Sequence, residues 1–117
     1  DRPNFGINAD LGNLVWNYDI PEETTEDAVR ALASVSVYWH CKNLDVVAHP
    51  ENERTVAWKT SLADGQMDYR FLMSTMIDAG YSGYVAIEGG RTNDQWYMDT
   101  QSLIHLRELE TELTSQR

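Results

Sequence analysis

The sequence predicts an α/β fold with about three strand–helix units around a parallel sheet. Short runs rich in apolar and β-branched residues alternate with segments in which apolar residues recur at helical spacing. Because parallel strands need a crossover connection, usually a helix, this alternation favours a parallel sheet. Such a sheet is normally buried on both faces, and the strand-like runs are apolar enough for that. No repeat or flexible linker interrupts the pattern, so we expect one structural unit.

The first strand–helix unit covers residues 4–34. Residues 4–10 (NFGINAD) are apolar-rich and lead into polar and glycine residues, which is the pattern of a strand that runs into a loop. Over residues 20–34 the apolar side chains recur at helical spacing. Thr24 or Thr25 can cap this helix, and the acidic residues that follow suit its N-terminal end because of the helix dipole.

The second unit contains an inserted hairpin. Residues 35–41 (VSVYWHC) are rich in β-branched and aromatic residues, which predicts a strand. Residues 45–58 predict a short hairpin with HPENE as its turn. A helix is expected over residues 67–79, and Gly80 is expected to be its C-cap.

The third unit begins with a strand over residues 84–88 (YVAIE) and ends with a helix over about residues 99–113. Three strands cannot close a barrel, because an eight-stranded α/β barrel needs about 250 residues. The expected buried face of the last helix consists of leucines at helical spacing: Leu103, Leu106, Leu109 and Leu113.

Composition limits the classes of partner. The chain has 117 residues and a formal net charge of −10, and its nine Lys and Arg residues are scattered. We therefore expect no nucleic-acid partner and no binding to an anionic membrane surface. No apolar run approaches the roughly 20 residues needed to cross a bilayer. The single cysteine, Cys41, excludes an internal disulfide and favours a reducing compartment, so we expect a cytoplasmic protein.

Each predicted strand ends in a residue that can bind a metal ion: Asp10, His40 and Glu88. In parallel α/β proteins the C-terminal ends of the strands face the active site. Two carboxylates and an imidazole suit Mn²⁺, Mg²⁺, Co²⁺ or Zn²⁺ better than a soft metal. Structural roles are the alternative: Asp10 can cap the following turn, and His40 can be a half-buried strand residue. Glu88 is harder to explain structurally, because a buried carboxylate needs a partner.

Several stretches resemble the xylose-isomerase-like sugar phosphate isomerase/epimerase superfamily. HCKN at residues 40–43 is similar to its His-x-Lys-Asp strand end, and NADLGN at residues 8–13 resembles its Asp-x-Gly-Asn/His strand end. LADGQMDYRFLMSTMIDAGYSGYVAIEGG at residues 62–90 is similar to the stretch before and through the last strand of that family. Residues 89–113 resemble its final loop and helix. The chain departs from the family at Asn43, where an Asp is usual, and at Ala63, where a Gly is usual.

The resemblance implies that residues 1–117 are the C-terminal portion, about three βα units, of a single (β/α)8 TIM-barrel domain whose N-terminal portion is absent. It implies one divalent metal ion held by four residues. Asp10, His40 and Glu88 match the last three of these, and a Glu on the preceding strand would be the fourth. The implied function is metal-dependent isomerisation or epimerisation of a sugar or polyol, by proton abstraction to a metal-stabilised enediolate. Glu88 is the candidate for one of the two carboxylates that move the proton.

Three further residues are candidates for substrate binding. Lys42 can hold a substrate hydroxyl, carboxylate or phosphate, Asn13 stands at a position where the family has His or Asn, and Arg91 can reach an anionic group. The alternatives are a solvated lysine for Lys42 and a helix-start cap for Asn13. Trp16 and Trp58 lie in expected loops, where they can line a sugar pocket or serve in packing.

Other functions remain open. The same metal site suits a lyase that dehydrates its substrate or cleaves a C-glycoside. A partial barrel that only binds sugar or assembles with other chains is a non-catalytic alternative, and a homo-oligomer is compatible with either reading. Because one of the four ligands is missing, we expect the chain alone to be a poor catalyst.

Overall fold

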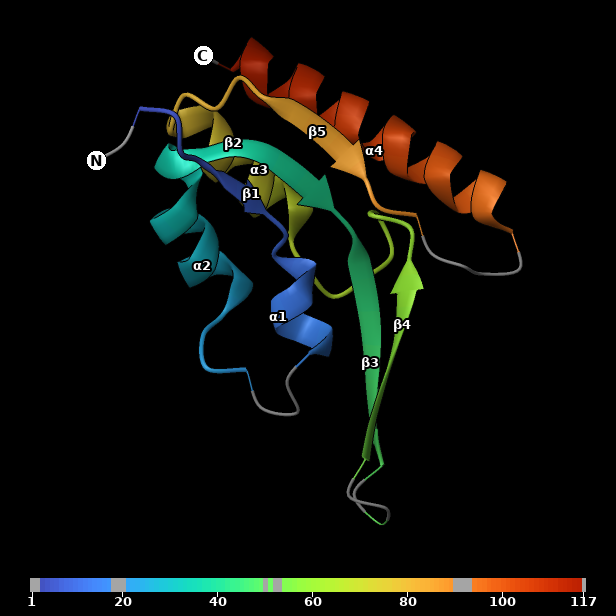
Figure 1. Cartoon of the computed structure of the whole chain (residues 1–117). Coiled ribbons are helices and arrows are strands. Elements are labelled where there is room, and N and C mark those ends of the chain that lie inside the picture. The colour runs from blue at the N-terminus through green and yellow to red at the C-terminus, as the bar shows by residue number, and fades with distance from the viewer. Residues whose placement is uncertain (1–2, 18–20, 50, 52–53, 90–93, 117) are drawn as a thin grey trace.

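The computed structural model describes residues 3–17, 21–49, 51, 54–89 and 94–116, and it contains a small parallel sheet, a hairpin and four α-helices within these ranges (Figure 1). The parallel sheet consists of β1 (Ile7–Ala9), β2 (Ser36–Cys41) and β5 (Tyr84–Ile87). The hairpin consists of β3 (Asn43–His49) and β4 (Arg54–Thr60). The helices are α1 (Gly12–Trp16), α2 (Thr25–Leu32), α3 (Tyr69–Asp78) and α4 (Gln95–Ser115), and a short 3₁₀ turn (Ala33–Val35) follows α2.

The strands of the sheet lie in the order β1, β2, β5, and both pairs are parallel. Ala9 pairs with Trp39, and His40 pairs with Ala86. The alternation of strands and helices in the sequence therefore predicts the topology correctly. In this register the C-terminal ends of the three strands meet at one edge of the sheet.

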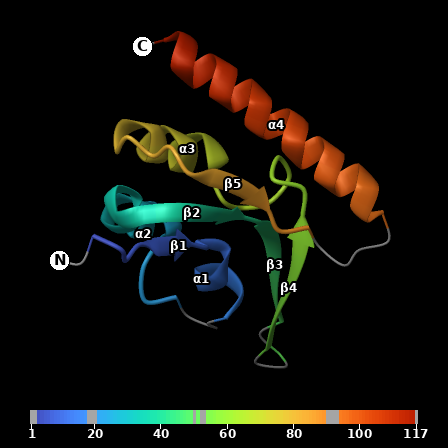
Figure 2. The same ribbon diagram turned by 45° about the horizontal axis from the view of Figure 1, so that its top comes forward.

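Helices α2, α3 and α4 cover one face of the sheet (Figure 2). Trp39 is fully buried on this face, where its ring stacks on Tyr69 and meets Tyr81 edge-on. Burial of such apolar surface stabilises the unit by about 25 cal/mol per Å². The rest of the core comes from the strands, the helices, the short 3₁₀ turn, and the loops that follow β1 and β4: Ala9, Leu11, Ala28, Val29, Ala33, Cys41, Leu62, Met67, Leu72, Met73, Met76, Leu106, Leu109 and Leu113.

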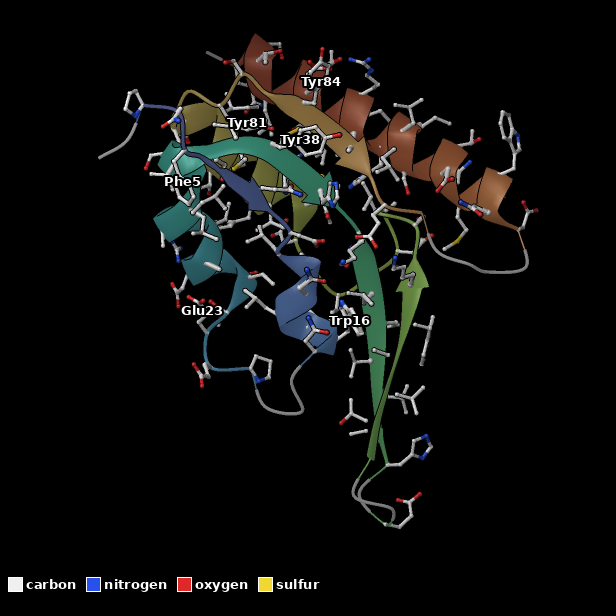
Figure 3. The ribbon with its side chains drawn as sticks, viewed as in Figure 1. Phe5, Trp16, Glu23, Tyr38, Tyr81 and Tyr84 are labelled. Carbon is white, nitrogen blue, oxygen red and sulfur yellow. The ribbon has the colours of Figure 1, made fainter. Side chains whose placement is uncertain are left out.

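The other face of the sheet is open in the described part of the chain. Tyr38 and Tyr84 pair across β2 and β5, and their rings lie 6.3 Å apart on this face (Figure 3). Tyr84 is 79% exposed. The expectation that both faces are buried is therefore wrong for the described residues, because every helix that packs on the sheet lies on the same side.

One helix boundary agrees with the expectation, and another differs from it. Thr24, one of the two candidate caps, caps α2 by accepting a hydrogen bond from the backbone of Asp27. Helix α4 begins at Gln95, four residues earlier than expected, because the Asp94 side chain caps it by accepting a hydrogen bond from the Tyr97 backbone.

The buried face of α4 also differs in one position from the expectation. Leu106, Leu109 and Leu113 are buried, but Leu103 is 51% exposed. Leu103 borders a hollow of about 500 Å³ between α3, β5 and α4 instead of packing into the core.

The hairpin projects away from the sheet beyond the end of β2, and its strands pair from Asn43 opposite Thr60 to His49 opposite Arg54 (Figure 1). It is two residues longer at each end than expected. Only Lys42 separates β3 from β2, and the chain turns there so that the hairpin runs away from the sheet (Figure 1). This brings the base of the hairpin, and Thr60 with it, close to the C-terminal edge of the sheet.

Candidate metal centre

Asp10, His40 and Glu88 lie side by side at the C-terminal edge of the sheet. Asp10 directly follows β1, His40 is the fifth residue of β2, and Glu88 directly follows β5. The Glu88 backbone N–H donates a 2.8 Å hydrogen bond to the carbonyl of Cys41, so the pairing of β2 and β5 extends one residue further. One potential ligand atom of each of the three residues lies within 4.8 Å of the others.

That spacing fits a single cation. Ligand atoms at about 2.0–2.4 Å from a metal ion are at most about 4.8 Å apart. The imidazole Nδ1 of His40 lies 3.7 Å from Oδ2 of Asp10. The other carboxylate oxygen of Asp10, Oδ1, is buried and has no hydrogen-bond partner among the described residues. Because buried polar atoms are nearly always paired, this oxygen is the clearest structural reason to place a cation here.

Lys42 joins the two carboxylates of this group. Its Nζ donates hydrogen bonds to Oδ2 of Asp10 at 2.9 Å and to Oε2 of Glu88 at 2.7 Å. The Lys42 side chain is only 3% exposed, and its stem packs against Gly12 in α1. The sequence alternative of a solvated lysine is therefore wrong, because the ammonium lies between two acids at the strand ends.

Lys59 brings a second ammonium from the hairpin. Its Nζ donates to Oε1 of Glu88 at 2.8 Å, so each oxygen of that carboxylate accepts a hydrogen bond from a different lysine. The sequence interpretation missed Lys59 because only the register of β3 and β4 places it here. One signal was present in the sequence: the chain contains just two lysines, and both belong to this network.

The lysines shift the pKa values of the network. Hydrogen bonds from Lys42, and then from Lys59, lower the pKa of Glu88 to about 2. Burial lowers the pKa of Lys42, but the hydrogen bonds to Glu88 and Asp10 outweigh burial, and the net shift is upward. Glu88 is thus held as a carboxylate and Lys42 as an ammonium, and the ionised carboxylate is the form that binds a cation.

Residues of α1 lie on the outer side of Lys42. The Trp16 ring centroid is 5.9 Å from Nζ of Lys42, within cation–π range, and the Trp16 side chain is about half exposed (Figure 3). Asn13 accepts a 2.9 Å hydrogen bond from the Trp16 indole. The expectation that Asn13 caps the helix start is wrong, because Leu11 occupies the cap position and Asn13 lies in the first turn of α1. Its assignment to substrate binding stays a prediction.

Asn43 explains one departure from the family pattern. Its side-chain amide is fully buried and makes four hydrogen bonds. The nitrogen donates to the carbonyls of Leu62 and Met67, and the oxygen accepts from the backbones of Leu44 and Met67. Gly65 also lies close to this amide, so the Asn43 side chain links the start of β3 to the loop before α3. An aspartate cannot donate the first two bonds, so Asn43 has a structural role here.

The remaining candidates lie away from this centre or outside the described residues. Trp58 is on β4, half exposed, and His49 is exposed near the hairpin tip beside Glu51. Arg91, which was predicted to bind substrate, falls outside the described residues.

Comparisons with known proteins support the fold. No family model matches the sequence, and no curated protein matches it significantly. Among solved structures, a xylose isomerase-like TIM barrel protein from Mycobacterium smegmatis in complex with magnesium is similar, with a TM-score of 0.75 and 24% identity. A xylose isomerase domain protein from Planctomyces limnophilus has a TM-score of 0.70 and 25% identity. The chain has the fold of part of a xylose isomerase-like TIM barrel.

The matches cover 92% and 99% of this chain but only 35% and 40% of the two structures. The chain thus spans well under half the length of either barrel. A partial barrel explains the open face of the sheet, because in a closed barrel the side chains that point inward fill the interior. It also places the candidate metal centre at the C-terminal face of the strands, where TIM barrels carry their active sites. None of the helices in the described part of the chain is long and apolar enough to cross a membrane.

Proposed function

We propose that this partial barrel carries three of the metal ligands of a metal-dependent isomerase or epimerase that acts on a sugar or polyol. The observation that carries the proposal is the convergence of Asp10, His40 and Glu88, together with the buried oxygen of Asp10 that has no hydrogen-bond partner among the described residues. The carboxylate and imidazole ligands suit Mg²⁺, Mn²⁺, Co²⁺ or Zn²⁺. The magnesium complex of the similar barrel from Mycobacterium smegmatis supports a divalent cation in this class of structure.

A divalent cation at this centre would act as a Lewis acid on neighbouring substrate oxygens and make the adjacent C–H more acidic. Glu88 then accepts the proton at one of its carboxylate oxygens. Both of these oxygens are hydrogen-bonded to ammonium groups, which weakens Glu88 as a base, since a catalytic base works best with a pKa near the working pH. Proton transfer therefore requires at least one lysine contact to lengthen when the substrate binds. Lys42 is placed to hold a substrate oxygen beside the carboxylates.

Metal binding is tested most directly at His40. No hydrogen bond of its side chain is among those of the described residues, so His40→Asn removes a ligand without breaking the lysine network. We expect Mn²⁺ affinity, measured by isothermal titration calorimetry, to fall about tenfold or more, since even changes around metal ligands cost about 10–100-fold. His49→Asn is the matched control at an exposed histidine and should bind as the unaltered protein does. Equal affinity of the His40 variant and this control contradicts the proposed centre.

Proton abstraction is tested by exchange with solvent. A panel of aldoses, ketoses, sugar acids and inositols is incubated with the protein and Mn²⁺ in D₂O, and NMR detects deuterium at carbon. An isomerase or epimerase incorporates deuterium into recovered sugar, whereas a lyase releases water or the aglycone. Glu88→Gln should slow incorporation by about 10²–10⁴-fold, the typical contribution of a general base. Unchanged incorporation in this variant contradicts the role of Glu88.

A non-catalytic assembly subunit is the second proposal, and the open sheet face favours it. Tyr38 and Tyr84 expose aromatic surface that a further layer of structure would bury. Native mass spectrometry tests it: stable oligomers that exchange no substrate hydrogen under any metal condition support assembly, and a monomer that exchanges hydrogen supports the enzyme.

A further inference from the structure

The two ammonium groups on Glu88 are held differently. Lys42 is buried and bridges two carboxylates, so it is fixed in place. Lys59 is 27% exposed, and Glu88 is its sole ion-pair partner among the described residues. Its backbone belongs to β4, opposite Leu44 of β3. A partly exposed lysine with one partner can exchange that partner for another anion at little cost, since exposed ion pairs contribute about 0–1 kcal/mol.

Building on the metal centre proposed above, we propose that Lys59 determines specificity by binding a negatively charged group at the reacting end of the substrate, as in an α-hydroxy carboxylate. The hairpin thus contributes to substrate specificity, because it brings the ammonium group of Lys59 to the metal centre. A metal ion bound by Glu88 would release Lys59 from Oε1, and the carboxylate of the substrate would then become the partner of Lys59.

The charge of the site supports an anionic ligand. Asp10 and Glu88 contribute two negative charges, and Lys42 and Lys59 contribute two positive charges, so the described ion pairs sum to zero. A divalent cation raises this sum to +2. Even the additional glutamate that the family resemblance implies would leave the site at +1. A neutral polyol leaves that charge uncompensated, whereas a carboxylate offsets it, and electrostatic complementarity of this kind discriminates between ligands.

The position of Lys59 sets where the negative charge must lie. Its Nζ is 2.8 Å from Glu88, which is itself one of the three proposed metal ligands. An anion that replaces this contact lies beside the metal centre and not several carbon atoms away. A substrate with a carboxylate next to a hydroxyl group fits this position, because its oxygens could reach a metal ion at the centre and the ammonium of Lys59 together. A phosphate at the far end of a sugar chain does not.

Glycolate and its neutral isostere glycolamide test this inference. Each is titrated into the protein in saturating Mg²⁺, and binding is followed by ¹H–¹⁵N NMR at the backbone amides of Lys42 and Glu88. Lys59→Gln should weaken glycolate binding about 5–10-fold, consistent with loss of one charge-assisted contact at a partly exposed site. Glycolamide binding should change less than about twofold. Lys59→Arg should restore the preference for glycolate, and Arg107→Gln, on the exposed side of α4, is the control for loss of one positive charge.

Mg²⁺ affinity, measured separately by calorimetry, distinguishes substrate binding by Lys59 from a role in which Lys59 only positions Glu88. If Lys59 binds substrate, Lys59→Gln keeps or raises Mg²⁺ affinity, because it removes a cation that competes for Glu88. If Lys59 only positions Glu88, Mg²⁺ affinity falls, and this inference is overturned. Intact Mg²⁺ binding with no selective loss of glycolate also overturns it but leaves the metal centre standing. Absence of Mg²⁺ binding in the unaltered protein overturns the metal centre and this inference with it.

Discussion

Substitution of Asn43 by aspartate is a sharp test of how the strand end is held. The change replaces one side-chain nitrogen by oxygen and leaves the shape of the group almost unaltered. The two hydrogen bonds that the nitrogen donates, to the carbonyls of Leu62 and Met67, are lost. The two bonds that Oδ1 accepts, from the backbones of Leu44 and Met67, remain and become charge-assisted.

The expected loss of stability follows from the number of hydrogen bonds that are lost and kept. Each buried acceptor that loses its donor costs about 1–3 kcal/mol, and burial of a charge in a fully enclosed position adds to that cost. The strengthened bonds to the carboxylate recover roughly 1–2 kcal/mol. We therefore expect Asn43→Asp to lower the free energy of unfolding at neutral pH by about 2–4 kcal/mol, a large part of the roughly 5–15 kcal/mol typical of a domain.

The pH dependence of Asn43→Asp separates this explanation from a simple loss of packing. Two carbonyls facing the introduced carboxyl group, and its burial, raise its folded pKa above the unfolded value of about 3.9. A raised folded pKa adds stability that is fully present below the unfolded pKa and is lost as the pH rises through the folded pKa. Protonation also returns one donor. The difference from the unaltered protein should therefore shrink between about pH 7.5 and about pH 5.

The assay is urea unfolding followed by tryptophan fluorescence, in which the buried Trp39 reports on the core. Asn4→Asp, at an exposed residue, is the matched control and should change the unfolding free energy by less than about 0.5 kcal/mol. Equal stability of the Asn43 and Asn4 variants, or a deficit at Asn43 that does not depend on pH, would refute the proposed hydrogen-bond arrangement.

Two further predictions concern the lysine network. Because the folded pKa of Glu88 is lowered from 4.5 to about 2, its ion pairs stabilise the metal-free protein above pH 4.5 and are lost as the pH falls toward 2. Glu88 is 38% exposed, so solvent screening limits the effect to about 1 kcal/mol. Urea unfolding at several pH values should show this slope in the unaltered protein, and Glu88→Gln should lack it. Gly12→Ala places a Cβ 2.4 Å from Cγ of Lys42, so urea unfolding should show a loss of about 1–3 kcal/mol. A gain of about 0.5–1 kcal/mol, normal for Gly→Ala in a helix, would contradict that packing.

The sequence predicts the elements well where the signal is local. The strand that contains His40 and the strand before Glu88 are short apolar runs, and their order with the helices predicts a parallel sheet. The sequence predicts a loop where helix α1 lies, because the five residues of this helix are too few to show a helical period. The exposure of Leu103 was also missed, since periodicity identifies a helix face but not how far the sheet extends beneath it.

The candidate site was predictable for a different reason. Residues at the ends of parallel strands converge because of topology alone, so Asp10, His40 and Glu88 could be grouped without knowing any contact. Lys59 could not be grouped with them, because its position depends on the register of a hairpin and on the angle at which that hairpin leaves the sheet. Likewise, four hydrogen bonds to one amide are invisible in a sequence that shows only an Asn where an Asp is usual.

At the proposed metal centre, the ion-pair network would make stability and metal binding oppose each other. In the metal-free protein, Lys42 and Lys59 neutralise Asp10 and Glu88, which would otherwise repel each other at the edge of the sheet. If a metal ion binds Glu88 as proposed, it competes with the two ammonium groups for the carboxylate oxygens, and this competition lowers its affinity. Lys42 cannot leave easily because its stem is buried against Gly12, whereas Lys59 can. In the proposed function the exchange would therefore fall on the hairpin lysine, and the arrival of a metal ion would release a cationic group that can meet a substrate.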